Sequence, residues 1–400
     1  MVMQGFPPPP DARVTLANWQ LPPYNRWSFQ HVREVVPTAR VSRGPGSGVP
    51  FPEDRADLSH TVVTRLDGTS TTLGEVMAST FTDGWLVLQE GRLLAEEYPT
   101  GMPADRPHLL MSVTKSLVGC VAGILIDRGT LDPDATMTTY IPELAESGYG
   151  GATVRHLLDM RSGIVFSEDY LDPRAEVRLL EQVVGWAPRT DPALPYTMYD
   201  FLALLPRGGE HGGSFSYRSS ETDMLGWACE RVTGTRMPDL LSALVWSRLG
   251  VEQDADFAVD SAGAPFHDGG LNTTLRDLAR FGQMLLEEGA GADGQQVVSA
   301  AWIRDSYAGG MDTRDAFAAT IGETLMPGGQ YRNQFWFPYP DRDLLLCLGI
   351  HGQMVYVNPA ARVVGVKLSS WETPQNAAML SDTIAAFDAV AVAVAVTVAS

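Results

Sequence analysis

Hydrophobic positions along the chain fall into short, strand-like runs towards both ends and longer, helix-like runs between them. Residues 85–89 and 93–98 are two apolar stretches joined by a tight turn at Gly91, a pattern that predicts a β-hairpin. Three further short runs rich in Leu, Ile and Val lie late in the chain, at residues 344–350, 354–357 and 363–368. Strands spaced so closely favour an antiparallel meander.

Between these ends, several stretches have the pattern of helices. Residues 116–127 are almost wholly apolar and are followed by Arg128-Gly129, which predicts a helix buried on every side. Weaker helical patterns, separated by Pro and Gly, occupy residues 154–160, 199–205, 221–232 and the segment from Ser381 onward. Gly234 directly follows one of them and is the expected C-cap of that helix.

The order of these elements predicts an α+β fold, an antiparallel sheet flanked by helices with an all-helical insertion. We expect an irregular N-terminal arm at residues 1–57, rich in Pro and Gly and anchored by its aromatic side chains. Residues 58–128 and 266–400 would form the α/β domain, closed by both ends of the chain. Residues 129–265 would form a mainly helical domain.

Composition and charge narrow the class of protein. Of the 400 residues 44% are hydrophobic and 19% charged, which is ordinary for a soluble globular chain. A formal net charge of −19 makes nucleic acid and anionic membranes poor partners and suits a small-molecule substrate. The N-terminus has no secretory pattern, and no uncharged run approaches the ~20 residues that span a membrane. Cys120, Cys229 and Cys347 lie in apolar runs, so we expect buried free thiols and a cytoplasmic protein.

Ser112 and Lys115, at the start of the apolar helix, are the first candidates for chemistry. A spacing of three residues places both side chains on one helical face. Burial would disfavour the ammonium and free the amine as a base, and the helix N-terminus would stabilise negative charge beside Ser112. An N-capping serine followed by a helical lysine is also a common structural feature, so the tetrapeptide alone does not decide between the two interpretations.

Two later segments could complete such a site. Tyr217 lies in a glycine-rich loop before a helix, where a phenol near a lysine could pass a proton to a leaving group. His351-Gly352-Gln353 lies between two strand-like runs, where the glycine permits close approach to a ligand and backbone amides could bind an oxyanion. Each segment also has a purely structural interpretation, a packed tyrosine and a plain strand turn.

Together these three motifs resemble those of the penicillin-recognising serine enzymes, which include class C β-lactamases, D-alanyl-D-alanine peptidases and family VIII esterases. Segments spread over nearly the whole chain are more similar still to the nylon-oligomer (6-aminohexanoate-dimer) hydrolases of that group. These segments include residues 22–27, 108–113, 168–173, 230–234, 349–353 and 367–371. The resemblance implies a β-lactamase-like fold and a serine hydrolase that needs no metal or cofactor.

The resemblance also implies a role for each matching residue. Ser112 would be the nucleophile, Lys115 its base and Tyr217 the proton donor to the leaving amine. Further residues would contact or position the substrate, namely Tyr170, Glu181, Asp268, His351, Gly352 and Gln353. Three positions depart from these patterns. His351 replaces the lysine of the β-lactamase third motif, and Ser219 replaces the asparagine usual in β-lactamases, although the nylon-oligomer hydrolases also have serine there. Glu181 replaces an aspartate of the nylon-oligomer hydrolases.

The sequence therefore predicts a serine hydrolase that cleaves linear 6-aminohexanoate amides and short-chain carboxyl esters through a Ser112 acyl-enzyme. One alternative is a β-lactamase-like or peptidase-like enzyme, which the missing third-motif lysine and secretory pattern disfavour. Another is a non-catalytic binding protein on the same scaffold, which retention of Ser112 and Lys115 disfavours. The sequence leaves a homodimer open.

Overall fold

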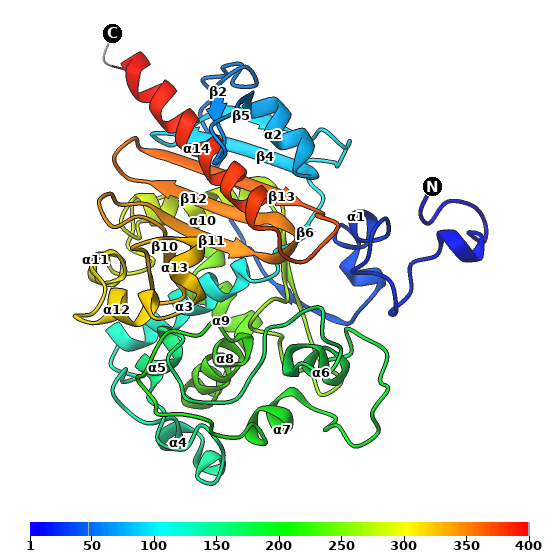
Figure 1. Cartoon of the computed structure of the whole chain (residues 1–400), viewed down its shortest axis with the longest axis vertical. Helices are drawn as coiled ribbons and strands as arrows, with labels where there is room; N and C mark the ends of the chain where they lie inside the picture. Colours follow the sequence, from blue (N-terminus) through cyan, green and yellow to red (C-terminus); the bar gives the residue numbers. More distant parts are fainter. Residues whose placement is uncertain (47, 399–400) are drawn as a thin grey trace.

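A seven-stranded antiparallel sheet is central to the computed structural model, which describes residues 1–46 and 48–398 (Figure 1). Its spatial order is β5-β4-β13-β12-β11-β10-β9, so strands from both ends of the chain lie side by side. The strands are β4 (Thr82–Gln89), β5 (Arg92–Glu97), β9 (Gln330–Arg332), β10 (Phe335–Phe337), β11 (Leu345–Gly349), β12 (Gln353–Asn358) and β13 (Val363–Ser369). The predicted hairpin and the predicted antiparallel meander are both confirmed.

The two faces of this sheet pack against different helices. Alternate residues of a strand point to opposite faces, and on β11 Leu345 and Cys347 enter one hydrophobic cluster while Leu346 enters another. Helices α3 (Val113–Asp127) and α10 (Leu275–Leu286) pack against the first face, and α14 (Ala377–Val398) packs against the second with α2 (Leu73–Ser79) beside it. The antiparallel sheet flanked by helices is the predicted fold class.

Helix α3 is buried along its length, as its apolar sequence predicts. Every residue from Val113 to Leu125 is buried, including the polar Thr114 and Ser116. Glycines allow neighbours to approach it closely, since a Cβ on Gly123 would lie 2.5 Å from the Trp302 ring. This helix is therefore held rigidly between the sheet and the helical layer.

The helical layer lies below the sheet in the view of Figure 1. It contains α4 (Met137–Tyr140), α5 (Val154–Leu158), α6 (Glu176–Val183), α7 (Met198–Ala203), α8 (Ser219–Thr233) and α9 (Met237–Leu244). The longest, α8, packs against α3 and ends at Gly234, whose φ of 65° is left-handed as expected for a C-cap glycine. Elements in the later half of the chain are α11 (Ala300–Ala308), α12 (Thr313–Ala318) and α13 (Ile321–Leu325).

A second sheet of four strands joins all three predicted domains. Its order is β1-β7-β8-β6, with strands β1 (Thr38–Val41), β7 (Ala255–Ala258), β8 (Leu271–Thr273) and β6 (His108–Leu109). Strand β1 belongs to the predicted arm and β7 to the predicted helical domain, and they pair with each other. The separate pair β2 (Val62–Thr64) and β3 (Ser70–Thr72) precedes α2.

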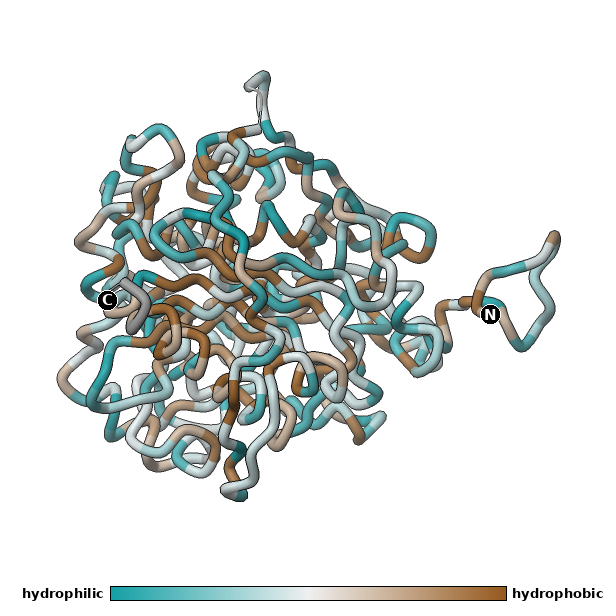
Figure 2. The backbone as a smooth tube through the Cα atoms, turned by 90° about the horizontal axis from the view of Figure 1, so that it is seen from above, coloured by the Kyte–Doolittle hydropathy of each residue, from teal (hydrophilic) through white to brown (hydrophobic). Residues whose placement is uncertain are grey.

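The N-terminal arm is anchored to the body beyond its projecting first residues (Figure 2). Trp19 and Phe29 are buried in the main hydrophobic cluster, as expected of anchoring aromatics. The short helix α1 (Asn25–Ser28) carries Arg26, whose guanidinium lies 3.1 Å from the buried carboxylate of Asp83. The arm thus packs against the large sheet where β4 begins.

The C-terminal Ala-Val repeat continues α14 and does not leave the helix. Within the described chain, residues Ala377–Ala395 form a helix long and apolar enough to cross a membrane by length and composition. This helix nevertheless carries Asp382, 3.3 Å from Arg65, and Asp388, which accepts a 2.7 Å hydrogen bond from Tyr356. Both partners come from the body of the protein, so the helix is fixed to the sheet by polar contacts as well as apolar ones.

The β9–β10 turn inserts between three helices. Its two residues, Asn333 (φ 54°) and Gln334 (φ 69°), both have left-handed backbones that cost energy in non-glycine residues. Hydrogen bonds of Gln334 to three helices offset this cost. Its backbone N–H donates to the Leu158 carbonyl at the end of α5 at 3.0 Å. Its backbone and side-chain carbonyl oxygens accept hydroxyl hydrogens from Ser116 on α3 and Thr222 on α8, at 2.8 Å each.

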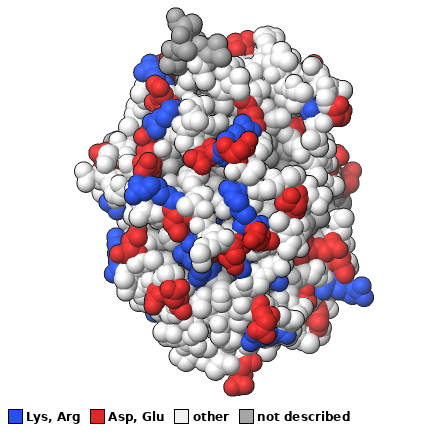
Figure 3. Space-filling model, turned by 60° about the vertical axis from the view of Figure 1, so that its left-hand side comes forward, with Lys and Arg blue, Asp and Glu red and all other residues white. Residues whose placement is uncertain are grey.

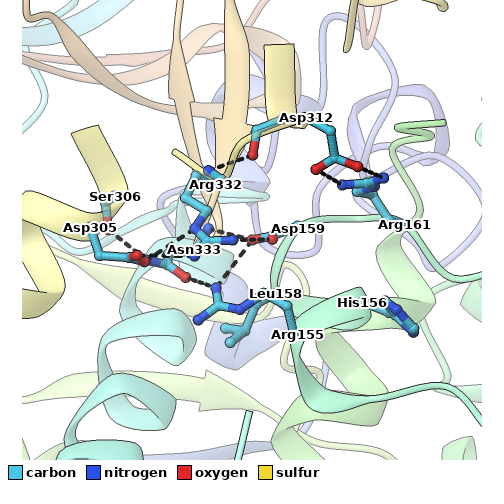
Figure 4. A network of polar contacts seen from close by, with 12 residues as sticks. Arg155, His156, Leu158, Asp159, Arg161, Asp305, Ser306, Asp312, Arg332 and Asn333 are labelled. Carbon is cyan, nitrogen blue, oxygen red and sulfur yellow. Dashed lines mark hydrogen bonds and ion pairs between the residues drawn. The ribbon is translucent and has the colours of Figure 1, made fainter. Parts of the chain in front are cut away.

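An ion-pair network surrounds the same turn (Figure 4). Arg332 lies 2.6 Å from Asp159 at the end of α5 and 3.0 Å from Asp305 on α11. Asn333 donates to Asp305 at 2.8 Å and accepts from Arg155. The network ties the outer strands of the sheet to the helical layer.

Candidate active site

Ser112 lies between strand β6 and helix α3, at the N-cap of the helix. Its side chain reaches the surface of a cavity, and the residue is 9% exposed. The preceding Met111 has a φ of 47°, an uncommon value for a long side chain. Among the described residues the Ser112 amide donates to no acceptor, so it is free to bind negative charge at the helix N-terminus.

Lys115 contacts Ser112 directly. The lysine Nζ lies 2.9 Å from Ser112 Oγ, 3.1 Å from Ser219 Oγ and 2.8 Å from the Asp268 carbonyl oxygen. The lysine is 1% exposed, and its nitrogen lies 5.2 Å from the centre of the Tyr217 ring. The spacing of three residues thus places the two polar groups in contact inside the protein.

The expectation that burial lowers the pKa of Lys115 is wrong. Desolvation does favour the neutral amine, but Coulomb attraction to Tyr217 once it ionises, and to the carboxylates of Asp268, Glu168 and Asp223, raises the pKa of Lys115 to about 12. The apolar sequence of the helix that carries the lysine gives no sign of these charges. The acidic groups come from other segments, and together they hold the resting side chain as an ammonium.

Two of these acidic groups form a buried pair beneath the lysine. Asp268 Oδ2 lies 3.7 Å from Lys115 Nζ, and the Asp268 amide donates to Asp223 Oδ1 at 3.0 Å. Burial raises the pKa of both carboxyls, and their mutual repulsion raises that of Asp223 further, while Lys115 opposes the rise in each. The ammonium of Lys115 therefore stabilises the negative charge of this pair.

Glu168 is the third carboxylate near Lys115. It accepts the Ser219 amide hydrogen and a 2.6 Å hydrogen bond from the Tyr170 hydroxyl. Burial raises the pKa of Glu168, although Lys115 opposes this. The loop that carries Tyr170 is thus fastened to the first turn of α8, whose Ser219 contacts the lysine.

Tyr217 stands over the lysine and against an aromatic wall. Its ring packs on Trp336 at 5.2 Å between centroids and on Tyr331 at 6.0 Å. Burial raises the pKa of Tyr217, while the charge of Lys115 and a hydrogen bond with Ser112 act in the opposite direction. The phenol is therefore neutral at ordinary pH and can donate a proton.

These groups open onto a cavity of about 1190 Å³. Ser112, Glu168 and Tyr217 line it, together with the strand edge from Leu348 to Met354 apart from His351. Its charged lining side chains among the described residues are Glu168, Glu210 and Arg218, and Arg218 is paired with Glu221 at 3.0 Å. A large and mainly apolar cavity beside Ser112 is what an organic substrate needs.

The third motif contributes backbone and a glycine to the cavity. Gly352 and Gln353 line it, and a Cβ on Gly352 would lie 2.2 Å from the Trp371 indole nitrogen, so only glycine fits there. The His351 side chain lies behind this wall, with Nδ1 2.7 Å from the Trp371 carbonyl oxygen. Burial lowers the pKa of His351 to about 4, so the ring is neutral and offers no cation to a substrate carboxylate.

Glu181 lies outside the cavity lining. Its carboxylate is 4% exposed and 2.6 Å from the guanidinium of Arg178, one turn earlier on α6. Burial raises the pKa of Glu181 to about 7, although Arg178 opposes the rise. The structure therefore brings Ser112, Lys115, Tyr217 and Asp268 together and leaves Glu181 paired within its own helix.

Glu168, Asp223 and Trp336 were not predicted as members of the site. Asp223 belongs to a run of polar residues that opens α8, where carboxylates are usually solvent-exposed, yet here the whole first turn is buried. Trp336 lies on a short strand far away in sequence. Of the three, only Glu168 could have been suspected from the sequence, because it lies two residues before Tyr170, a predicted substrate contact.

Replacing Asp268 by asparagine should lower the pKa of Lys115, because one of the charges that favours the ammonium is removed. The rise of kcat/KM with pH should then move to lower pH by about 1–2 units, as expected for a charge within 4–6 Å. A series of kcat/KM values for p-nitrophenyl acetate across the neutral and alkaline range measures this shift. Asp256→Asn, which removes a buried carboxylate paired with Arg33 outside the cavity, should leave the profile in place, and an unmoved profile in Asp268→Asn would contradict the electrostatic role.

Comparison with known proteins identifies the family. Residues 72–389 match the beta-lactamase family model, and the chain belongs to this family. It is 42% identical over 365 residues to the 6-aminohexanoate-dimer hydrolase of Paenarthrobacter ureafaciens, covering 90% of this chain and 89% of that one. Esterase EstB of Burkholderia gladioli is 30% identical over 42% of this chain and 43% of its own.

Solved structures agree with this assignment. A Bacillus anthracis protein provisionally named a 6-aminohexanoate-dimer hydrolase superposes with a TM-score of 0.87 at 30% identity, covering 96% of this chain and 97% of that one. A family VIII carboxylesterase superposes with a TM-score of 0.59 at 16% identity, covering 85% of this chain and all of that one, and shares the fold.

Proposed function

We propose that this protein is a serine hydrolase that cleaves carboxyl esters and linear amides, including 6-aminohexanoate oligomers, through an acyl-enzyme on Ser112. The observation that carries the proposal is the 2.9 Å contact between Lys115 Nζ and Ser112 Oγ at the cavity surface, with Tyr217 above them. The hydrolase and esterase names of the relatives agree with this chemistry.

In the first step Ser112 attacks the substrate carbonyl and its proton passes to Lys115. The lysine must first lose a proton, because its three N–H groups point at three oxygens in the resting site. As a neutral amine it keeps two of these bonds, to Ser219 and to the Asp268 carbonyl, and turns its lone pair to Ser112. Because Lys115 must be neutral to act as base, we expect kcat/KM to rise with pH.

The attack makes the carbonyl oxygen negative in a tetrahedral intermediate, and the C=O bond re-forms when the leaving group departs. The free Ser112 amide and an amide of the strand edge at residues 351–354 would stabilise the oxyanion. Tyr217 would protonate the leaving nitrogen or oxygen and recover its proton through Lys115. Water then enters the cavity and hydrolyses the ester on Ser112 with the same groups in reversed roles.

The site is less suited to β-lactam antibiotics. These carry a carboxylate, and the residue that would bind it here is a neutral, buried histidine. We place the enzyme in the cytoplasm, where thiols stay reduced, because the three cysteines of the chain are free and buried.

Stopped-flow measurement with p-nitrophenyl acetate tests the proposal. We expect a burst of p-nitrophenol equal to the enzyme concentration, because acylation of a good leaving group outpaces deacylation. Intact-mass analysis during turnover should show one acetyl group on the protein. Slow linear release with an unmodified mass would contradict an acyl-enzyme on this chain.

A further inference from the structure

One part of the cavity lies on the α14 face of the large sheet. Residues Trp336, Leu348 and Met354 are on neighbouring strands β10, β11 and β12 and on one face, with Leu348 opposite Met354 and Trp336 opposite Leu346, two residues before Leu348. The same face packs against α14, and a single hydrophobic cluster contains Met326 and Met354 with Trp336, Leu348 and Leu380 against it. We call the part of the cavity lined by Leu325, Met326, Trp336, Leu348 and Leu380 the apolar arm.

The apolar arm begins where the leaving group would depart. Tyr217, the proposed proton donor, packs its ring on Trp336 at 5.2 Å. A leaving atom that receives the Tyr217 proton therefore lies in the part of the cavity that Trp336 also lines. The apolar arm is the uncharged part of the cavity into which the substituent on that atom can continue.

The apolar arm offers no charge to a substituent placed in it. The cavity-lining residues around it are Thr320, Gly322, Trp371, Pro374, Gln375, Asn376 and Ala377, all uncharged. The charged lining side chains are two carboxylates and Arg218, which is 14% exposed and held by Glu221. The further carboxylates Asp223 and Asp268 lie close to the lysine, so the nearby field is negative.

We infer that the apolar arm binds a neutral aliphatic leaving group, the alcohol of an ester or the amine of an amide, in preference to one that ends in a carboxylate. This inference rests on the proposed function and ranks its substrates: esters and amides of neutral alcohols and amines come first, ahead of 6-aminohexanoate oligomers, whose departing amine ends in a carboxylate. A methylene chain would bury apolar surface against Trp336 and Leu380. A terminal carboxylate in the same place would lose its water without gaining a partner.

The test compares two esters that form the same acetyl-enzyme, hexyl acetate and 6-acetoxyhexanoate. Because deacylation is common to both, the ratio of their kcat/KM values, measured by release of acetate, reports the leaving group alone. We expect hexyl acetate to be favoured by about tenfold or more, the discrimination typical of an apolar pocket. Equal values, or a preference for the carboxylate, would overturn the inference.

Variants locate the effect in the apolar arm. Leu380→Trp fills it from α14 and should lower the hexyl-to-ethyl acetate ratio of kcat/KM about tenfold. Val392→Trp, on the same helix but 65% exposed and outside the cavity, is the matched control and should leave the ratio unchanged. Leu325→Arg, at an exposed position of the arm, should raise the relative activity on 6-acetoxyhexanoate. Ratios that are the same in all four proteins would place the leaving group elsewhere.

The outcomes also separate this inference from the function on which it rests. A protein that shows a burst with p-nitrophenyl acetate but no preference between the two hexyl esters retains the proposed function and loses the inference. A protein without burst or turnover on any ester loses both.

Discussion

Replacing Ser112 by alanine is expected to abolish the burst with p-nitrophenyl acetate and to lower kcat by about 10⁴-fold or more. The nucleophile is lost, and a hydrolase of this kind retains only what binding and oxyanion stabilisation supply. Stopped-flow absorbance gives the burst, steady-state rates give kcat, and intact mass shows whether any acetyl group remains on the protein.

Ser116→Ala is the matched control for this substitution. Ser116 lies one turn further along α3 and donates a 2.8 Å hydrogen bond to the Gln334 carbonyl, away from the cavity lining. Its loss should cost about 1 kcal/mol of stability, the usual value for one hydrogen bond, and leave the burst in place. A burst that survives in Ser112→Ala would transfer the nucleophile to another residue.

Replacing Lys115 by either methionine or arginine should lower kcat/KM by about 10³-fold, the middle of the range for general acid–base catalysis. Methionine removes the amine and leaves three carboxylates without their cation. Arginine keeps the positive charge but cannot lose its proton near neutral pH, so it tests the base separately from the charge. Steady-state kinetics with p-nitrophenyl acetate measure both variants.

Thermal unfolding followed by circular dichroism shows whether either variant is folded. We expect Lys115→Met to be the less stable, because Asp268, Asp223 and Glu168 then remain buried with no counter-charge. Arginine at this position should restore stability more than activity. Recovery of full activity by Lys115→Arg would show that charge alone is needed and would end the assignment of Lys115 as base.

Local patterns were sufficient to predict much of the fold. The apolar run after Lys115 predicted a helix with no solvent-facing side, and the short runs near residues 345–368 predicted the meander. These predictions succeed because they depend on neighbours in sequence, whose periodicity records which side of an element is buried. The spacing of Ser112 and Lys115 belongs to the same class, since one helical turn brings them together.

Features that depend on distant segments were not predictable in this way. The pKa of Lys115 is set by carboxylates from three other parts of the chain, and a helix considered alone gives the wrong sign. Strand β1 was hidden within the N-terminal arm because its partner β7 lies more than 200 residues later. The apolar arm is lined by residues from two strands and two helices. It therefore cannot be predicted from the pattern of any one segment.

The buried turn at Asn333-Gln334 has a consequence for how relatives of this protein can diverge. The turn bonds to α3, α5 and α8 at once, so a change there disturbs both the helix that follows Ser112 and the aromatic wall of Tyr331 and Trp336 that flanks the turn. Helix α13 and the first turn of α14 take no part in these hydrogen bonds. New preferences for the departing half of a substrate should therefore accumulate in those two segments over generations, while the turn itself drifts very little.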